Sequence, residues 1–255
     1  MNIDIQKVVP VALKAGEKIM AIYGEEDFQI ETKADHSPLT LADKTSHAII
    51  QKELNGLYPD IPLLSEEGKS IPYSERKDWP AFWLVDPLDG TKEFIRRNGE
   101  FTVNIALIEQ HRPVLGVMAA PALDVLYFAQ KGEGAFKQSL GNSPINIYAN
   151  QNTQNGLIAV KSRSHATDEE EAFFNRYQIS DSVSVGSALK FCMVAEGRAH
   201  VYYRHGPTWE WDTGAGHVIA ECAGASVYHL EYNKENLLNS SFLVSSVETV
   251  QMSEL

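Results

Sequence analysis

The chain has 255 residues, of which 44% are hydrophobic and 22% are charged, and its formal net charge is −12. A chain of this length can bury a large core, and its acidic balance argues against a nucleic-acid polymer as partner, because phosphate contacts need Lys and Arg. No apolar run is long enough for a transmembrane segment and no signal-peptide pattern opens the chain, so we expect a cytoplasmic protein.

In the first half, apolar residues at helical spacing predict a helix over residues 5–23, and Pro10 within it predicts a late helix start or a kink. A capping pattern at Thr40 predicts a second helix, which ends before residues 59–62. Residues 81–85 form an apolar run that predicts a strand buried on both faces and ending at Asp86. The pattern also predicts strands at residues 27–33, 101–109, 113–120 and 125–129, and a short helix at 91–97.

In the second half, a polar segment at residues 150–156 is interpreted as a connection between domains. Strands predicted at residues 157–161, 183–186, 199–204 and 225–229 then alternate with helices predicted at 168–177, 188–196 and 213–223. Such alternation is typical of an α/β domain. We therefore expect an N-terminal α+β domain over residues 1–150 and a C-terminal α/β domain over residues 151–255, with a loosely ordered tail.

Acidic residues at three places are each open to a structural explanation. Glu66-Glu67 precedes a glycine and is consistent with a solvated turn. Asp212 precedes a predicted helix and is consistent with a cap, whereas Asp43 stands where the acid of a capping box belongs.

The segment Asp86-Pro87-Leu88-Asp89-Gly90-Thr91 predicts more than a cap. Two close carboxylates at the end of a buried strand repel each other and need a cation, and hard oxygen ligands suit Mg²⁺. The Leu88 carbonyl, fixed by Pro87, offers a further oxygen, and Gly90 opens a helix start whose N–H groups favour phosphate. A structural calcium loop and a tight turn are the alternatives.

Together with Glu66-Glu67 upstream and Trp211-Asp212-Thr213-Gly214-Ala215-Gly216-His217 downstream, this segment resembles the two signatures of the inositol monophosphatase superfamily. Thr40-Leu41-Ala42-Asp43 is similar to the segment that carries a supporting aspartate in that family. The resemblance covers nearly the whole chain. It implies a layered αβαβα sandwich, of mixed α+β and α/β character, and a lithium-sensitive, Mg²⁺-dependent phosphatase.

Within the superfamily, the chain resembles the 3′(2′),5′-bisphosphate nucleotidase branch of CysQ type. The resemblance rests on the segments at residues 89–95, 161–165, 184–192, 194–199 and 206–212. Trp209 and Gly214 depart from the pattern, since a less bulky residue is expected at the first position and often alanine at the second. Neither departure removes a ligand, although Trp209 alters the rim of the expected pocket.

The resemblance implies roles for individual residues. Two or three Mg²⁺ ions would be held by Glu66, Asp86, the Leu88 carbonyl, Asp89 and Asp212. Thr91, held by Asp43, would orient the attacking water and deprotonate it together with Glu66, and Glu67 would support them. The expected substrate-binding residues are Glu66, Leu88, Asp89, Gly90, Thr91, Ser162, Arg163, His165, Ser187, Lys190, Arg204 and Asp212. His217 is interpreted as a packing or capping residue.

The implied reaction is hydrolysis of the 3′-phosphate of 3′-phosphoadenosine 5′-phosphate (PAP) to AMP and phosphate, with the sulfated analogue as a further substrate. The alternatives are an inositol monophosphatase or another small sugar phosphatase, and a catalytically silent nucleotide- or metal-binding regulator. We expect a small-molecule nucleotide bisphosphate as partner and a monomer or homodimer. The expected location is the cytoplasm, either free or peripheral on the cytoplasmic face of the inner membrane.

Overall fold

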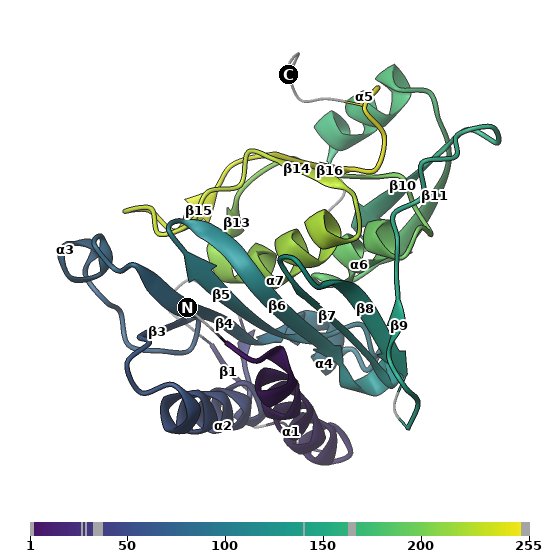
Figure 1. Cartoon of the computed structure of the whole chain (residues 1–255). Helices are drawn as coiled ribbons and strands as arrows, with labels where there is room; N and C mark the ends of the chain where they lie inside the picture. The colour runs from purple at the N-terminus through teal and green to yellow at the C-terminus, as the bar shows by residue number, and fades with distance from the viewer. Residues whose placement is uncertain are drawn as a thin grey trace.

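The computed structural model describes residues 3–26, 28, 30–32, 38–139, 141–162 and 167–250. Within these residues the elements form five layers, in the order helices, sheet, helices, sheet, helix (Figure 1). This arrangement confirms the layered sandwich expected from the sequence. Among the described helices, none combines the length and the apolar character that a membrane span requires.

The first layer is a pair of helices, α1 (Ile5–Tyr23) and α2 (Leu41–Leu57), which pack against each other and cover one face of the first sheet. Helix α1 begins at Ile5 with Asp4 as its N-cap, so the expected late start is wrong. Gln6 and Pro10 are both exposed, and water can therefore replace the one backbone hydrogen bond that Pro10 cannot donate.

The first sheet has seven strands among the described residues, in the order β3-β4-β5-β6-β7-β8-β9. Only β3 and β4 are parallel neighbours. Along β4, Trp83 and Val85 contact the core under α1 and α2, whereas Phe82 and Leu84 contact the core on the opposite face. The strands are β3 (Leu63–Ser65), β4 (Ala81–Asp89), β5 (Thr102–Glu109), β6 (Arg112–Ala120), β7 (Val125–Gln130), β8 (Gly134–Ser139) and β9 (Ile145–Asn146).

The middle layer consists of α6 (Leu189–Ala195) and α7 (Glu210–Cys222), which lie between the two sheets (Figure 1). Helix α7 approaches the first sheet closely at Gly116 of β6. A Cβ atom at Gly116 would lie 2.5 Å from Cγ1 of Val218 and 2.7 Å from the carbonyl oxygen of Ala215. Glycine at this position thus permits the contact that brings the start of α7 over β4.

The second sheet has five described strands, in the order β11-β10-β12-β16-β14. Its outer face is covered by α5 (Asp168–Arg176), where Phe173 stacks on Tyr203 with ring centroids 4.2 Å apart. The strands are β10 (Leu157–Ser162), β11 (Ile179–Val185), β12 (Val201–Arg204), β14 (Ser226–Tyr228) and β16 (Phe242–Ser245). The last of these was not predicted from the sequence.

The remaining elements are short: β1 (Glu31–Thr32), β2 (Pro38–Leu39), α3 (Tyr73–Arg76), α4 (Thr91–Ile95), a 3₁₀ turn (Pro121–Leu123), β13 (Thr208–Trp209) and β15 (Leu238–Asn239). Of the strand predicted at residues 27–33, Glu31–Thr32 forms β1, and residues 27, 29 and 33 lie outside the described residues.

The predicted boundary near residue 150 falls between the two sheets. Because α7 packs against the first sheet, one core spans both halves, and the division into two domains stays a prediction.

Candidate active site

Strand β4 and the turn into α4 contain Asp86-Pro87-Leu88-Asp89-Gly90-Thr91, the segment that predicted a cation site. We predicted that this strand ends at Asp86, but its pairing with β5 continues to Asp89 across a register shift, with Asp86 opposite Asn104 and Asp89 opposite Thr102. Pro87 cannot donate to a strand partner, and the irregularity accommodates it at this point. Asp86 is 1% exposed, and its Oδ1 accepts a 3.0 Å hydrogen bond from the Leu88 N–H.

Glu66 reaches the same place from the loop after β3. Strand β3 runs parallel to β4, and Ser65 is paired with Val85. The residues that follow, Glu66 and Asp86, therefore lie next to each other at the same end of the two strands. The Glu66 N–H donates to the Val85 carbonyl at 3.1 Å, which fixes the backbone of Glu66 beside Asp86. The two carboxylates thus come from segments that are distant in sequence but adjacent in the sheet.

Asp212 completes the cluster from the opposite layer. We expected it to precede a helix, but α7 begins at Glu210 and Asp212 lies in its first turn. Its Oδ2 accepts a 3.2 Å hydrogen bond from the N–H of Trp209, the N-cap residue. The Asp212 carboxylate thus plays the part of the acid in a capping box. The Trp209 ring lines a cavity beside the acidic cluster and stacks on Trp211, with the two ring centroids 5.0 Å apart.

Electrostatic repulsion dominates where these acids meet. Carboxylate oxygens of Glu66, Asp86 and Asp212 all lie within 4.8 Å of one another. Burial, together with the neighbouring carboxylates, raises the pKa of Asp86 and of Asp212 well above its ordinary value. Burial likewise raises the pKa of Asp89 to about 6, although Lys190 and the Ala188 N–H oppose that rise. An all-oxygen donor set of this charge fits a hard divalent cation, which would relieve the repulsion.

Thr91 and Asp43 form a hydrogen-bonded pair beside the cluster. Asp43 is 1% exposed and belongs to the capping box of α2, in which its Oδ2 accepts the Thr40 N–H at 2.7 Å and the Thr40 hydroxyl at 2.5 Å. Its Oδ1 accepts the Thr91 hydroxyl at 3.1 Å. Gly90, at φ 89°, turns the chain from β4 into α4 in a conformation that favours glycine. One carboxylate therefore caps a helix and holds the threonine.

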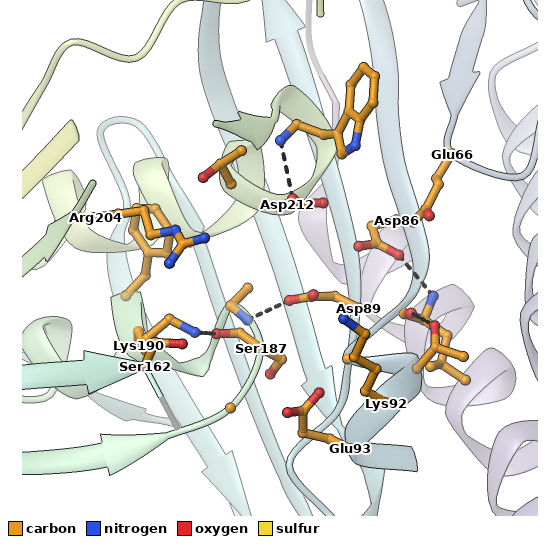
Figure 2. A pocket seen from close by; sticks show the side chains of 18 of the residues that line it. Glu66, Asp86, Asp89, Lys92, Glu93, Ser162, Ser187, Lys190, Arg204 and Asp212 are labelled. Atoms are coloured by element: carbon orange, nitrogen blue, oxygen red, sulfur yellow. Dashed lines mark hydrogen bonds between the residues drawn. The ribbon is translucent and has the colours of Figure 1, made fainter. Parts of the chain in front are cut away.

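Basic and hydroxyl side chains from the second half form the other side of the site (Figure 2). Lys190 in α6 is 8% exposed, its Nζ donates to the Ser187 carbonyl, and burial lowers its pKa. Arg204, at the end of β12, lies 3.4 Å from a carboxylate oxygen of Glu170. Ser162 ends β10 and lines the cavity beside them.

A cavity of about 370 Å³ joins the two sides. Figure 2 shows the carboxylates of Glu66, Asp86 and Asp212 turned toward one another, with Lys190 and Arg204 across the cavity. The predicted residues that line it are Glu66, Asp86, Leu88, Asp89, Gly90, Thr91, Ser162, Ser187, Lys190, Arg204 and Asp212.

The residues that line the cavity and the predicted site residues do not coincide at every position. Glu67 is not among the lining residues, and Asp43 lies behind Thr91. The predictions for Arg163 and His165 fall outside the described residues. Glu93 and Tyr202 line the cavity but were not predicted as site residues. A buried glutamate in a short helix and a tyrosine in a strand have ordinary structural explanations, so nothing in their local sequence marks them as site residues.

The sequence profile of the inositol monophosphatase family matches residues 4–254. The 3′(2′),5′-bisphosphate nucleotidase CysQ of Salmonella typhimurium is 46% identical over 249 residues, which cover 94% of this chain and 99% of that protein. The CysQ of Escherichia coli K12 is 45% identical with the same coverage. Among solved structures, CysQ from Bacteroides thetaiotaomicron has a TM-score of 0.82 at 45% identity and covers 94% of this chain and 96% of that chain. An IMPase from Thermotoga maritima has a TM-score of 0.78 at 26% identity, with 95% and 91% covered.

Proposed function

The chain belongs to the inositol monophosphatase family, and on that premise we propose that it hydrolyses the 3′-phosphate of PAP to give AMP and phosphate. Relatives that are 45% to 46% identical across nearly the whole chain carry the name 3′(2′),5′-bisphosphate nucleotidase. One observation supports the choice of substrate most directly. The cavity holds a carboxylate cluster on one side and two cationic side chains, Lys190 and Arg204, on the other. Such a cavity suits a substrate with two separate anionic groups.

The carboxylate side is proposed to bind two or three Mg²⁺ ions. Their ligands would be the side chains of Glu66, Asp86, Asp89 and Asp212 and the carbonyl of Leu88, all of which line the cavity. When bound, Mg²⁺ supplies Lewis acidity toward water and toward the phosphate ester. The four carboxylates would balance the charge of two such ions, because each ion offsets two negative charges.

Thr91 is proposed to orient the attacking water. Its hydroxyl donates to Asp43, so the lone pairs of its oxygen remain to accept a hydrogen bond from that water. Glu66 lines the same cavity and is the proposed acceptor of the proton that the water loses. Asp43 fixes the rotamer of Thr91 from behind, and Glu67 supports Glu66 from the adjoining turn.

Lys190 and Arg204 are proposed to bind the second anionic group, with Ser162 and Ser187 beside it. Burial lowers the pKa of the Lys190 ammonium, and an anionic ligand within hydrogen-bonding distance would raise it again. Arg204 offers a planar group that suits phosphate or sulfate oxygens. Since both cations recognise charge rather than the identity of phosphorus, we extend the proposal to the sulfated analogue of PAP.

Two other functions fit the fold. An inositol monophosphatase or another small sugar phosphatase would use the same carboxylates, because these contact only the phosphate and the leaving oxygen. The buried Lys190 and the nearby Arg204 favour the bisphosphate instead. A silent regulator that binds only a nucleotide is disfavoured by the clustered carboxylates of Glu66, Asp86 and Asp212, since a protein that binds no cation has no use for their mutual repulsion.

The position of cleavage tests the proposal. PAP is incubated with the protein and Mg²⁺, and the products are resolved by phosphorus NMR. We expect orthophosphate and adenosine 5′-monophosphate to appear in equal amounts. Adenosine 3′-monophosphate as the nucleoside product would contradict the proposal, because the 5′-phosphate would then be the group at the carboxylate cluster. A protein with Asp86→Asn serves as the control and should release no phosphate above background.

A further inference from the structure

The loop between β11 and α6, residues 186–188, lines the cavity beside Lys190 and is here named the pocket loop. Two carboxylates from the first half of the chain hold it. Oε2 of Glu100 accepts the Gly186 N–H at 2.8 Å, and Oδ2 of Asp89 accepts the Ala188 N–H. The pocket loop is therefore tied to the strand and loop that carry the carboxylate side of the cavity, about ninety residues away in the sequence (86 and 99 positions).

The pocket loop has little room to shift toward the first half. A Cβ atom at Gly186 would lie 2.8 Å from Cγ of Glu93 and 3.0 Å from the Glu100 carbonyl oxygen. Ser187 has φ 50°, a left-handed conformation that residues other than glycine rarely adopt. Because such a conformation persists only where its surroundings impose it, the two carboxylate contacts are the natural restraint on the pocket loop.

The position of the Lys190 ammonium group depends on the same loop. Its Nζ donates to the carbonyl of Ser187, the residue that the two restraints enclose. Figure 2 shows this bond on the cationic side of the cavity, with Asp89 bonded to the pocket loop from the opposite side. A shift of Ser187 would therefore move the ammonium group away from the place where it faces the cavity.

We propose that Glu100 is a positioning residue for the substrate's second anionic group. Glu100 does not line the cavity, so it acts by holding the pocket loop and, through Ser187, the Lys190 ammonium. The inference rests on the proposed function, in which Lys190 binds the second phosphate. Asp89 is unsuitable as a probe because it also belongs to the proposed metal ligands. A substitution at Glu100 removes one restraint on the pocket loop without removing a proposed metal ligand.

Kinetics with two substrates test this role. Glu100→Ala should raise the KM for PAP roughly 10-fold or more, since a hydrogen bond to a charged group is lost, and leave kcat nearly unchanged. Hydrolysis of glycerol 2-phosphate, which has no second anion, should stay within about twofold of wild type, the range expected when the reacting groups are untouched. Glu100→Gln keeps an acceptor oxygen and should recover most of the affinity. Glu133→Ala, at an exposed turn, is the matched control and should change neither substrate.

Hydrogen exchange provides a measurement that needs no turnover. The amides of Gly186 and Ala188 should exchange faster in Glu100→Ala than in wild type, and Glu100→Gln should resemble wild type. Unchanged exchange in Glu100→Ala, or an equal loss of activity on both substrates, would overturn the proposal. If wild type failed to hydrolyse PAP while Glu100→Ala still accelerated exchange, the proposed function would fail and the hold of Glu100 on the pocket loop would stand.

Discussion

The Thr91 hydroxyl donates a 3.1 Å hydrogen bond to Oδ1 of Asp43, a residue 48 positions earlier in the chain. The other oxygen of the same carboxylate accepts both the backbone N–H and the hydroxyl of Thr40 at the start of α2. The rotamer of Thr91 is thus set by a helix cap in the first layer of the fold. Both functions of Asp43 can be tested separately, because each uses a different oxygen.

We predict that Asp43→Asn lowers kcat by about 100-fold or more, since the amide no longer offers a charged acceptor to Thr91 while the water still requires orientation. Thr40→Ala removes only the capping partner and should cost about 1 kcal/mol of unfolding free energy with a much smaller loss of kcat. Steady-state kinetics and urea unfolding of both variants provide the measurement. An equal loss of kcat in the two variants would show that Asp43 acts through helix stability alone.

Metal affinity should increase with pH. Because burial and mutual repulsion raise the pKa of Asp86 and Asp212, the metal-free cluster retains protons that a cation must displace. Calorimetric titration with Mg²⁺ between pH 5.5 and 8 should therefore show tighter binding at the higher pH, with proton release that varies with the buffer. Affinity that is independent of pH over this range would argue that the carboxylates are already ionised.

Asp212→Asn should change stability in opposite directions with and without metal. At pH 8, where the metal-free cluster holds fewer protons than at pH 5.5, removal of one of its three carboxylates relieves repulsion, so the metal-free variant should be more stable than wild type. The same substitution removes a proposed ligand, so added Mg²⁺ should stabilise the variant less, in line with its weaker binding. Thermal unfolding in EDTA and in excess Mg²⁺ distinguishes the two effects. Destabilisation of the variant in EDTA would contradict this account of the cluster.

Lys190→Met should raise the KM for PAP by roughly 10- to 100-fold at saturating Mg²⁺, as expected for the loss of a charged hydrogen bond to phosphate. Methionine keeps the apolar stem but removes the contact of Nζ with the Tyr202 ring, whose centroid lies 5.6 Å from that atom in wild type. Arg204 is a less informative target, because its removal would leave Glu170, 2% exposed, without that cation. A KM for PAP that stays at the wild-type value would remove Lys190 from the second-phosphate site.

A further buried acid, Glu210, gives the fold a pH dependence of its own. Glu210 accepts the N–H groups of Asn233 at 2.6 Å and Lys234 at 3.0 Å, and burial raises its pKa to about 7. The folded chain then binds this proton more tightly than the unfolded chain, so the contribution of Glu210 to stability falls as pH rises from about 4.5 toward 7. In EDTA, Glu210→Gln should gain about 3 kcal/mol relative to wild type between pH 5 and pH 8. A constant difference between the two proteins in urea unfolding would contradict this.

Short-range sequence patterns predicted individual helices and strands and the central motif, whereas the arrangement in layers came from the resemblance to a known family. The apolar run before Asp86 predicted a strand buried on both faces, and Thr40 predicted the start of α2, as the structure shows. The pairing of Asp89 with Thr102 was missed because Pro87 normally ends strand pairing, and the register shift that accommodates it depends on β5. The resemblance to a known family, rather than spacing, supplied the association of Asp43 with Thr91.

Charged residues buried by tertiary contacts were the least predictable part of the site. Glu93 lines the cavity, and Glu100 bonds to the pocket loop, yet both lie in a segment whose charges suggest a solvated surface. Glu93 is buried and Glu100 is half-buried because the second half of the chain packs Gly186 against them. A single sequence holds no local sign of such a contact, because the two segments meet only after both sheets have formed.

A comparison of two substrates tests whether the cavity is built for a nucleotide bisphosphate or for a sugar phosphate. We would measure kcat/KM for PAP and for inositol 1-phosphate with the same wild-type preparation at saturating Mg²⁺. We expect a value for PAP that is higher by roughly two orders of magnitude, since contacts with a second phosphate at Lys190 and Arg204 are worth about 2–3 kcal/mol. A higher kcat/KM for inositol 1-phosphate would contradict it and assign the cavity to a sugar phosphate.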